Sequence, residues 1–145
     1  MKPIPVTILC NTIFSYIYSI HGISMEKLTI QEEEAMQLIW RSNGGFIKEL
    51  LDSIPGEKVP YTTLASTIKN LQRKGYVTAV RYANAYRYEP AVAEEDYKKS
   101  FMNGFVSDYF KNSYKELVSF FAKEEKISAE ELDEILRMIK EEKNR

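Results

Sequence analysis

The sequence predicts a mainly α-helical protein: a winged helix-turn-helix, made of three helices and a β-hairpin wing, followed by a three-helix dimerisation arm. Apolar residues recur at three- and four-residue spacing in three segments before residue 75, which is the periodicity of helices with one buried face. Two runs of β-branched and aromatic residues then flank a turn at residues 83–85, which is typical of a hairpin. From residue 97, aromatic residues repeat every four positions, which begins a second helical region.

The composition is that of a soluble globular protein, with 145 residues, 44% hydrophobic and 28% charged residues and a formal charge of −1. The length suits one domain, or a small domain with an oligomerisation extension. The single cysteine, Cys10, allows no internal disulfide, and with the single histidine, His21, it cannot build a metal cage. We therefore expect no metal, no cofactor and a reducing, cytoplasmic location.

Residues 3–25 carry no charged side chain, and three interpretations of this stretch compete. A membrane span has the right length but is diluted by hydroxyls and prolines. A signal peptide lacks a strongly basic start and a convincing cleavage site. We favour the third interpretation, in which Met25 is the initiator, because M-E-K-L-T-I-Q-E-E-E is typical of a soluble start. We accordingly divide the chain into an extension at 1–24, a winged helix at 25–92 and a helical dimerisation domain at 93–143.

The first helix is predicted from a capping box, in which the side chains of Thr29 and Glu32 satisfy two free amides at a helix start. It runs to about Ser42, where Asn43-Gly44-Gly45 stops it. A second, shorter helix is expected at Phe46 to Ser53.

The third helix follows Pro60, which suits a first turn, and ends before Gly75, which suits a left-handed stop. Leu64, Ile68 and Leu71 form its buried stripe. Its outward face carries hydroxyls, an amide and cations but no acid, in Thr62, Thr63, Ser66, Lys69, Asn70 and Arg73.

Charge is segregated along the chain. From Lys58 to Arg87 there are six cations and no acid, whereas residues 93–145 hold ten cations and thirteen acids. A chance lack of acids in one helix is the alternative explanation, but the hairpin after it shows the same lack. The segment therefore suits a polyanion such as DNA.

The hairpin is predicted at residues 76–90 around an Asn-bearing turn. Arg81 and Arg87 are its candidates for phosphate contacts. Cross-strand packing is the alternative role for its tyrosines, and we expect it for at least one of Tyr82, Tyr86 and Tyr88. The complete set of candidate DNA-binding residues is Tyr61, Thr62, Thr63, Ser66, Thr67, Lys69, Asn70, Arg73, Lys74, Arg81, Tyr82 and Arg87.

Three more helices are expected from Ala93 onward, the last of them with a capping box at Ser128 and Glu131. Their aromatic and aliphatic stripes are too broad for a three-helix arm to bury alone, so we expect a second copy of the chain to cover them. Folding back on the same subunit is the alternative. The candidate dimerisation residues are Tyr97, Phe101, Phe105, Tyr109, Leu117, Phe121, Leu132, Ile135, Leu136 and Ile139.

Over about residues 28–140 the chain resembles the BlaI/MecI penicillinase-repressor family of winged-helix regulators. The resemblance is carried by L-T-x-x-E at residues 28–32 with Trp40, by Y-T-T-L at 61–64 with L-Q-R-K-G-Y-V at 71–77, and by S-x-E-E-L-x-x-I at 128–135. It implies a homodimer that binds a palindromic DNA operator, represses transcription and is removed when a membrane sensor triggers proteolysis. In well-known members the cut falls between Asn and Phe. The matching bond here joins Gly104 to Phe105, so this chain has the Phe of the cleavage site but not the Asn.

The sequence thus predicts a sequence-specific DNA-binding repressor and no enzyme, because residues 25–145 contain no His, Cys or glycine-rich phosphate loop. The alternative is a winged helix used as a protein-interaction module without DNA binding. No small-molecule ligand is indicated.

Overall fold

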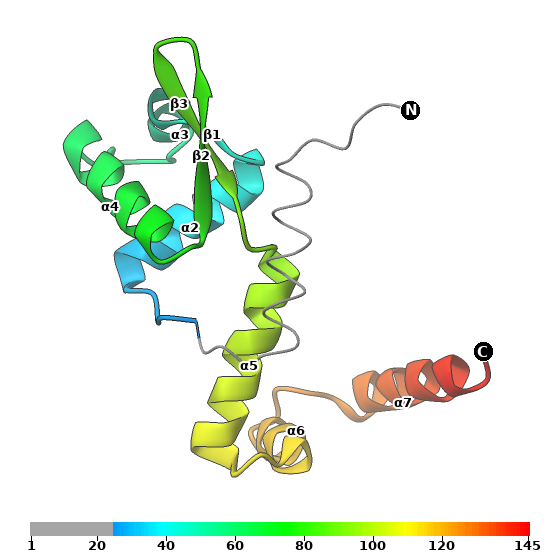
Figure 1. The fold of residues 1–145 in the computed structure, drawn as a ribbon. Helices are drawn as coiled ribbons and strands as arrows, with labels where there is room; N and C mark the ends of the chain where they lie inside the picture. The colour runs from blue at the N-terminus through cyan, green and yellow to red at the C-terminus, as the bar shows by residue number, and fades with distance from the viewer. Residues whose placement is uncertain (1–24) are drawn as a thin grey trace. The chain divides into compact units, whose positions relative to one another are not determined.

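The computed structural model describes residues 25–145, so the competing interpretations of residues 1–24 lie outside the described residues. The chain divides into two compact units, the first ending at Tyr97 and the second running from Lys98 to Arg145. None of the helices in residues 25–145 is long and apolar enough to span a membrane. The elements, labelled as in Figure 1, are α2 (Ile30–Ser42), β1 (Gly45–Phe46), α3 (Ile47–Asp52), α4 (Tyr61–Arg73), β2 (Val77–Tyr82), β3 (Ala85–Pro90), α5 (Glu94–Phe110), α6 (Tyr114–Lys123) and α7 (Ala129–Lys143).

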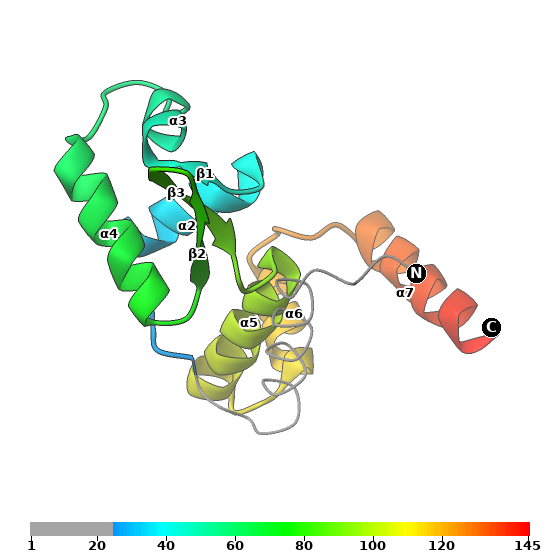
Figure 2. The ribbon, with the colours of Figure 1, turned by 45° about the horizontal axis from the view of Figure 1, so that its top comes forward.

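The first unit is a winged helix, as predicted. Helix α4 packs against α2, α3 and strand β2, and the β2–β3 hairpin extends from this helical cluster (Figures 1 and 2). The apolar stripes expected for the three helices meet in one core, whose most deeply buried members are Met36, Ile39, Leu50, Ile68, Leu71 and Tyr76. Burial of these stripes is the main force that holds α4 in place.

Local signals define the helix ends. The capping box of α2 is confirmed: the Thr29 amide donates to Glu32 Oε2 at 2.9 Å and the Glu32 amide donates to Thr29 Oγ1 at 3.3 Å. The capping box of α7 at Ser128 is also present. Helix α2 ends at Asn43 in the left-handed region, and Gly75, at φ +84°, follows α4 as predicted.

The sheet contains one strand that the sequence did not predict. Strand order is β1-β3-β2, and β1 pairs with Arg87 and Tyr88 of β3. The approach requires glycine at position 44, because a Cβ there would lie 2.6 Å from the Tyr88 carbonyl oxygen. The hairpin turn is shorter than expected, since Ala85 already belongs to β3.

The second unit consists of the rest of α5 with α6 and α7. The rings of Phe110 and Phe120 lie 5.8 Å apart and join α5 to α6. Val106 is the only buried residue of α5, while α6 and α7 contain none among the residues described. Much apolar surface of this unit is therefore exposed in one chain.

Candidate nucleic-acid interface

Helix α4 presents a polar, acid-free face to solvent. Its predicted stripe is buried, with Leu64, Ile68 and Leu71 at most 5% exposed. The first turn contains no acid, and Pro60 at the N-cap makes no side-chain capping bond. The exposed side chains are Tyr61, Thr62, Thr63, Ser66, Lys69, Asn70, Gln72 and Arg73. This face combines hydrogen-bonding groups with positive charge, which suits the base edges and phosphates of DNA.

Thr67 does not belong to this face, so its prediction as a DNA-binding residue is wrong. It is 8% exposed, and its hydroxyl donates to the Thr63 carbonyl oxygen at 2.9 Å. The reason is helical spacing, because position 67 lies three residues after Leu64 and thus on the buried side.

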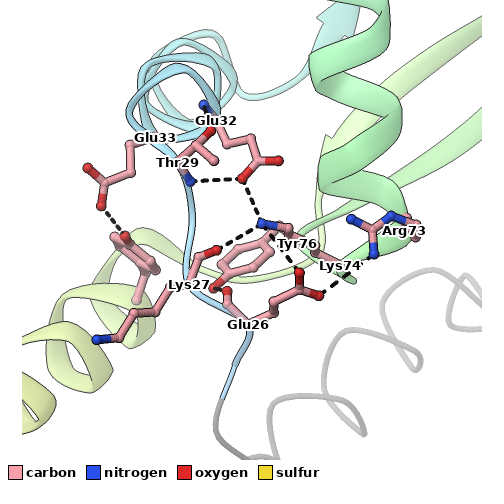
Figure 3. Close-up of polar contacts among 9 residues, drawn as sticks. Glu26, Lys27, Thr29, Glu32, Glu33, Arg73, Lys74 and Tyr76 are labelled. Atoms are coloured by element: carbon pink, nitrogen blue, oxygen red, sulfur yellow. Dashed lines mark hydrogen bonds and ion pairs between the residues drawn. The ribbon is translucent and has the colours of Figure 1, made fainter.

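Lys74 is also unavailable to DNA, which corrects a second prediction. Figure 3 shows its ammonium among oxygens from the segment that begins α2. It donates to Glu32 Oε2 and to the Lys27 carbonyl oxygen, both at 2.8 Å, and lies 3.6 Å from Glu26 Oε1. Only 7% of the Lys74 side chain and 6% of the Glu32 side chain are exposed. Lys74 therefore fixes the C-terminal end of α4 to the start of α2.

Arg87 is held by Glu89 of its own strand and by the Asn43 carbonyl oxygen at the end of α2, which weakens its prediction as a phosphate contact. Its guanidinium donates to Glu89 Oε1 at 2.8 Å and to the Asn43 carbonyl oxygen at 3.0 Å. Glu89 neutralises the guanidinium charge, and the two bonds occupy two of its five N–H donors.

Other cations on this surface remain exposed. Arg73 lies 3.8 Å from a Glu26 carboxylate oxygen, and Lys58 lies 3.3 Å from Asp52, but both pairs are more than half exposed and weak. Folding thus brings carboxylates close to several cations of the acid-free segment. Lys69 and Arg81 are exposed cations that form no ion pair with a described residue.

Strand register divides the hairpin tyrosines between two faces. Arg81 pairs with Tyr86 and Ala79 with Tyr88, so these residues share one face of the hairpin, the face that carries the buried Tyr88. Tyr82 lies on the opposite face, where its ring meets Phe46 edge-on at 6.0 Å. Tyr88 packs in the core, as we expected of at least one tyrosine, whereas Tyr86 is 52% exposed. Tyr86 is therefore a candidate contact residue that the sequence reasoning missed.

Tyr97 belongs to the winged-helix unit, which corrects its prediction as a dimerisation residue. Its ring lies 5.4 Å from that of Trp40 and 6.0 Å from that of Tyr76, and its hydroxyl donates to the Glu33 carboxylate. Burial, followed by the Glu33 hydrogen bond and charge, strongly raises the pKa of the Tyr97 phenol. This side chain helps to close the core of the first unit.

The other candidate dimerisation residues lie on the second unit, exposed or half-buried. Exposure reaches 53% at Phe101 and 73% at Tyr109, and on α7 it is 46–50% at Ile135, Leu136 and Ile139. Phe105 stacks between Phe101 and Tyr109. Phe121 is exposed, and Leu117 and Leu132 are half-buried. One chain alone leaves this apolar surface in water.

Gly104 lies in the middle of α5, and a Cβ built on it would meet no atom within 4 Å. We expect Gly104→Ala to raise the free energy of unfolding by about 0.5–1 kcal/mol, because glycine is the weaker helix former. Urea unfolding followed by far-ultraviolet circular dichroism would measure the change. Ser107→Ala, at an exposed position one turn later, is a matched control with a smaller expected gain. A loss of stability in Gly104→Ala would contradict this prediction.

No group of three or more His, Cys, Asp or Glu residues in the described part of the chain is arranged to hold a metal ion.

Comparisons with known proteins identify the family of the chain. The family model described as "Penicillinase repressor" matches residues 28–141. The chain is 23% identical to the methicillin resistance regulatory protein MecI of Staphylococcus aureus (strain N315), over 78% of this chain and 93% of that protein. It is also 23% identical to the penicillinase repressor of Bacillus licheniformis, over 79% of this chain and 90% of that protein. A similar solved structure is that of Bacillus licheniformis BlaI in monomeric form with the blaP half-operator. It has a TM-score of 0.43 and 20% identity, and covers 50% of this chain and 90% of that one.

Proposed function

Because this chain belongs to the penicillinase repressor family, we propose that it is a sequence-specific DNA-binding repressor that acts as a homodimer on a two-fold symmetric operator. The observation that carries the proposal is the exposed, acid-free face of α4 beside a wing whose Arg81 pairs with no described carboxylate.

Helix α4 is proposed to enter the major groove, as the second helix of a helix-turn-helix does. Thr62, Thr63 and Ser66 would then face base edges from the first half of the helix, and Asn70 from the second. An Asn side chain can bond adenine in a bidentate manner, which discriminates between bases by about 1–3 kcal/mol.

Lys69 and Arg81 are proposed to hold phosphates on either side of that groove. Phosphate contacts fix the register of a protein on DNA but carry no sequence information. Arg73 is a weaker candidate, because Glu26 lies 3.8 Å from its guanidinium.

The second unit is proposed to pair with its counterpart in another copy. Its exposed aromatic and aliphatic side chains form an apolar surface, whose exposure to water is unfavourable and which no described part of the same unit covers. A paired arm would hold two α4 helices about one turn of DNA apart, or a multiple of it.

Release from DNA is proposed to follow a cut in α5 by a membrane sensor-protease system, with the bond from Gly104 to Phe105 as the candidate. This proposal is supported by the exposure of Gly104 and by the low helix propensity of glycine, which favours local opening.

The test measures binding of purified protein to duplexes selected from a random DNA pool, at several salt concentrations. Lys69→Ala with Arg81→Ala should weaken binding at least tenfold and reduce the slope of log K against log salt by about two, because two phosphate contacts are lost. Lys115→Ala with Arg137→Ala removes the same charge from the second unit and should leave the slope unchanged. An unaltered slope in the first variant would count against this interface. Failure of the wild-type protein to select any DNA would favour a protein-interaction module instead.

A further inference from the structure

A cleft of about 430 Å³ lies between α2, the first half of α4 and the loop that joins α3 to α4. All of its lining residues belong to the first unit. Its volume falls within the range of about 300–1,000 Å³ that is usual for small-molecule sites. The cleft is therefore large enough to hold a small organic molecule.

The floor of the cleft is apolar. Ala35 and Leu38 of α2 and Leu64 of α4 line it, and each is 5% exposed. Val59, from the loop, also lines it and is 41% exposed. A ligand with an apolar body would gain contact with this floor and would remove part of the Val59 side chain from water.

Two carboxylates without partners line the same cleft. Glu34 and Glu57 are both exposed, and neither carboxylate forms a hydrogen bond or an ion pair with another described residue. Each of the other acids in residues 25–93 has such a partner, namely Glu26, Glu32, Glu33, Glu49, Asp52 and Glu89. A solvated acid needs no partner, but it is informative that both of these acids lie at one apolar cleft.

The net charge of the lining favours a cation. Among the described lining residues there are two carboxylates and one guanidinium, that of Arg41, which gives a net charge of −1. Arg41 lies seven residues after Glu34 on α2, a distance of about 10 Å along the helix axis. A positive group beside Glu34 would therefore lie about two helical turns from the Arg41 charge.

We propose that this cleft binds a small organic cation, whose charge lies at Glu34 and Glu57 and whose apolar body covers the floor. An ammonium or phosphonium group with aliphatic or aromatic substituents has this chemistry.

Binding in the cleft is proposed to exclude DNA, and this part rests on the proposed function. Thr63 lines the cleft and is also one of the residues proposed to face base edges. Its carbonyl oxygen accepts the hydroxyls of Ser66 and Thr67, both at 2.9 Å, which fixes the geometry of this turn of α4. A ligand body against Thr63 would occupy space that the duplex needs. Linkage then requires that DNA weaken binding of the cation by the same factor.

The first test uses two ions of nearly the same size and shape but opposite charge, tetraphenylphosphonium and tetraphenylborate. Isothermal titration calorimetry of the wild-type protein should show one tetraphenylphosphonium bound per chain, at least about tenfold more tightly than tetraphenylborate. Equal affinity for the two ions would indicate apolar adsorption alone and would overturn the proposal, as would the absence of tetraphenylphosphonium binding.

Exposed acids allow a matched pair of variants. Glu34→Gln with Glu57→Gln should weaken tetraphenylphosphonium binding about tenfold, because two ion pairs are lost, and should not weaken tetraphenylborate binding. Glu134→Gln with Glu141→Gln removes the same charge from exposed positions of α7 and should leave the affinity for the cation within about twofold of wild type. An equal effect of the two double variants would show a general charge effect and overturn the cleft as the site.

A second arm measures the coupling to DNA. With tetraphenylphosphonium at three times its wild-type dissociation constant, mutually exclusive binding should weaken wild-type affinity for the selected duplex about fourfold, the factor 1 + [L]/Kd. Glu34→Gln with Glu57→Gln should lose only about 1.3-fold at the same concentration, because its dissociation constant is about tenfold higher. This variant also controls for direct interaction between the ion and DNA, so equal losses in the two proteins would overturn the coupling.

The two proposals fail in distinguishable ways. Wild-type protein that prefers tetraphenylphosphonium but selects no DNA contradicts the repressor function and leaves the cation site supported. Wild-type protein that binds DNA but shows no preference for the cation contradicts only the cation site.

Discussion

Lys74→Met is expected to lower the free energy of unfolding of the winged-helix unit by about 3 kcal/mol, because it leaves the buried carboxylate of Glu32 without its cation. The two charges are 2.8 Å apart and almost fully buried. Methionine keeps most of the length of the lysine side chain, so lost packing contributes little. Urea unfolding followed by the fluorescence of the single tryptophan, Trp40, would report the change.

Two further variants isolate the buried pair. Arg73→Met removes a cation that is 63% exposed and should cost less than about 1 kcal/mol. Lys74→Met combined with Glu32→Gln should cost less than the sum of the single changes, since no buried charge is left unpaired. A Lys74→Met protein as stable as wild type would contradict the importance of this contact.

The same pair predicts a dependence of stability on pH. Burial alone would raise the pKa of Glu32, but hydrogen bonds from Lys74 and Thr29 and the Lys74 charge outweigh it and lower the pKa below the ordinary value of 4.5. The carboxylate therefore contributes stability above about pH 4.5, and this contribution is lost as the pH falls through the folded-state pKa. Without Lys74, burial opposes a weaker set of bonds, so Lys74→Met should lose less stability on acidification than wild type. An identical acid-induced loss in the two proteins would argue against this contribution.

Tyr97→Ala is the second large effect that we expect, at about 3 kcal/mol, the range for removal of a packed aromatic side chain. The ring of Tyr97 lies against Trp40 and Tyr76, and its hydroxyl bonds to Glu33. The loss should appear in Trp40 fluorescence during urea unfolding at a fixed protein concentration, because stability of a dimer depends on concentration.

Controls separate core packing from dimerisation. Tyr97→Phe keeps the ring and should cost about 1 kcal/mol for the lost hydrogen bond. Phe101→Ala, one turn further along α5 and 53% exposed, should shift the monomer–dimer equilibrium measured by analytical ultracentrifugation. If Tyr97→Ala instead dissociated the dimer while leaving the first unit equally stable, the assignment of Tyr97 to the core would be wrong.

Much of the architecture could be predicted from local sequence signals. The stripe of Leu64, Ile68 and Leu71 is buried as periodicity requires, and the capping boxes at Thr29 and Ser128 are formed. These signals succeed because helix periodicity and capping depend on residues within one or two turns.

Contacts between distant segments could not be predicted in this way. The run from Lys58 to Arg87 contains no acid, but folding brings Glu26 and Glu32 to Lys74. Strand β1 has only two residues, too few to show the alternation of apolar and polar residues that predicts a strand. It forms because Gly44 lets the backbone approach β3. Tyr97 shares the four-residue spacing of Phe101, Phe105 and Tyr109, but periodicity does not show whether each side chain packs within its own chain or against a second copy.

The burial of Thr67 could have been predicted from the sequence. Its spacing from Leu64 and Leu71 places it on the buried side of α4, where it is 8% exposed. A buried threonine is tolerated in a helix when its hydroxyl donates to a backbone carbonyl one turn earlier.

The segment before α2 has a practical consequence for anyone who shortens this protein. The carbonyl oxygens of Glu26 and Lys27 accept hydrogen bonds from the Tyr76 hydroxyl and the Lys74 ammonium, and Met25 packs on the core. A version trimmed to the region that matches the family model, which starts at residue 28, would lose these acceptors and destabilise the C-terminal end of α4. Affinity tags and truncations are therefore better placed before Met25 or after α7.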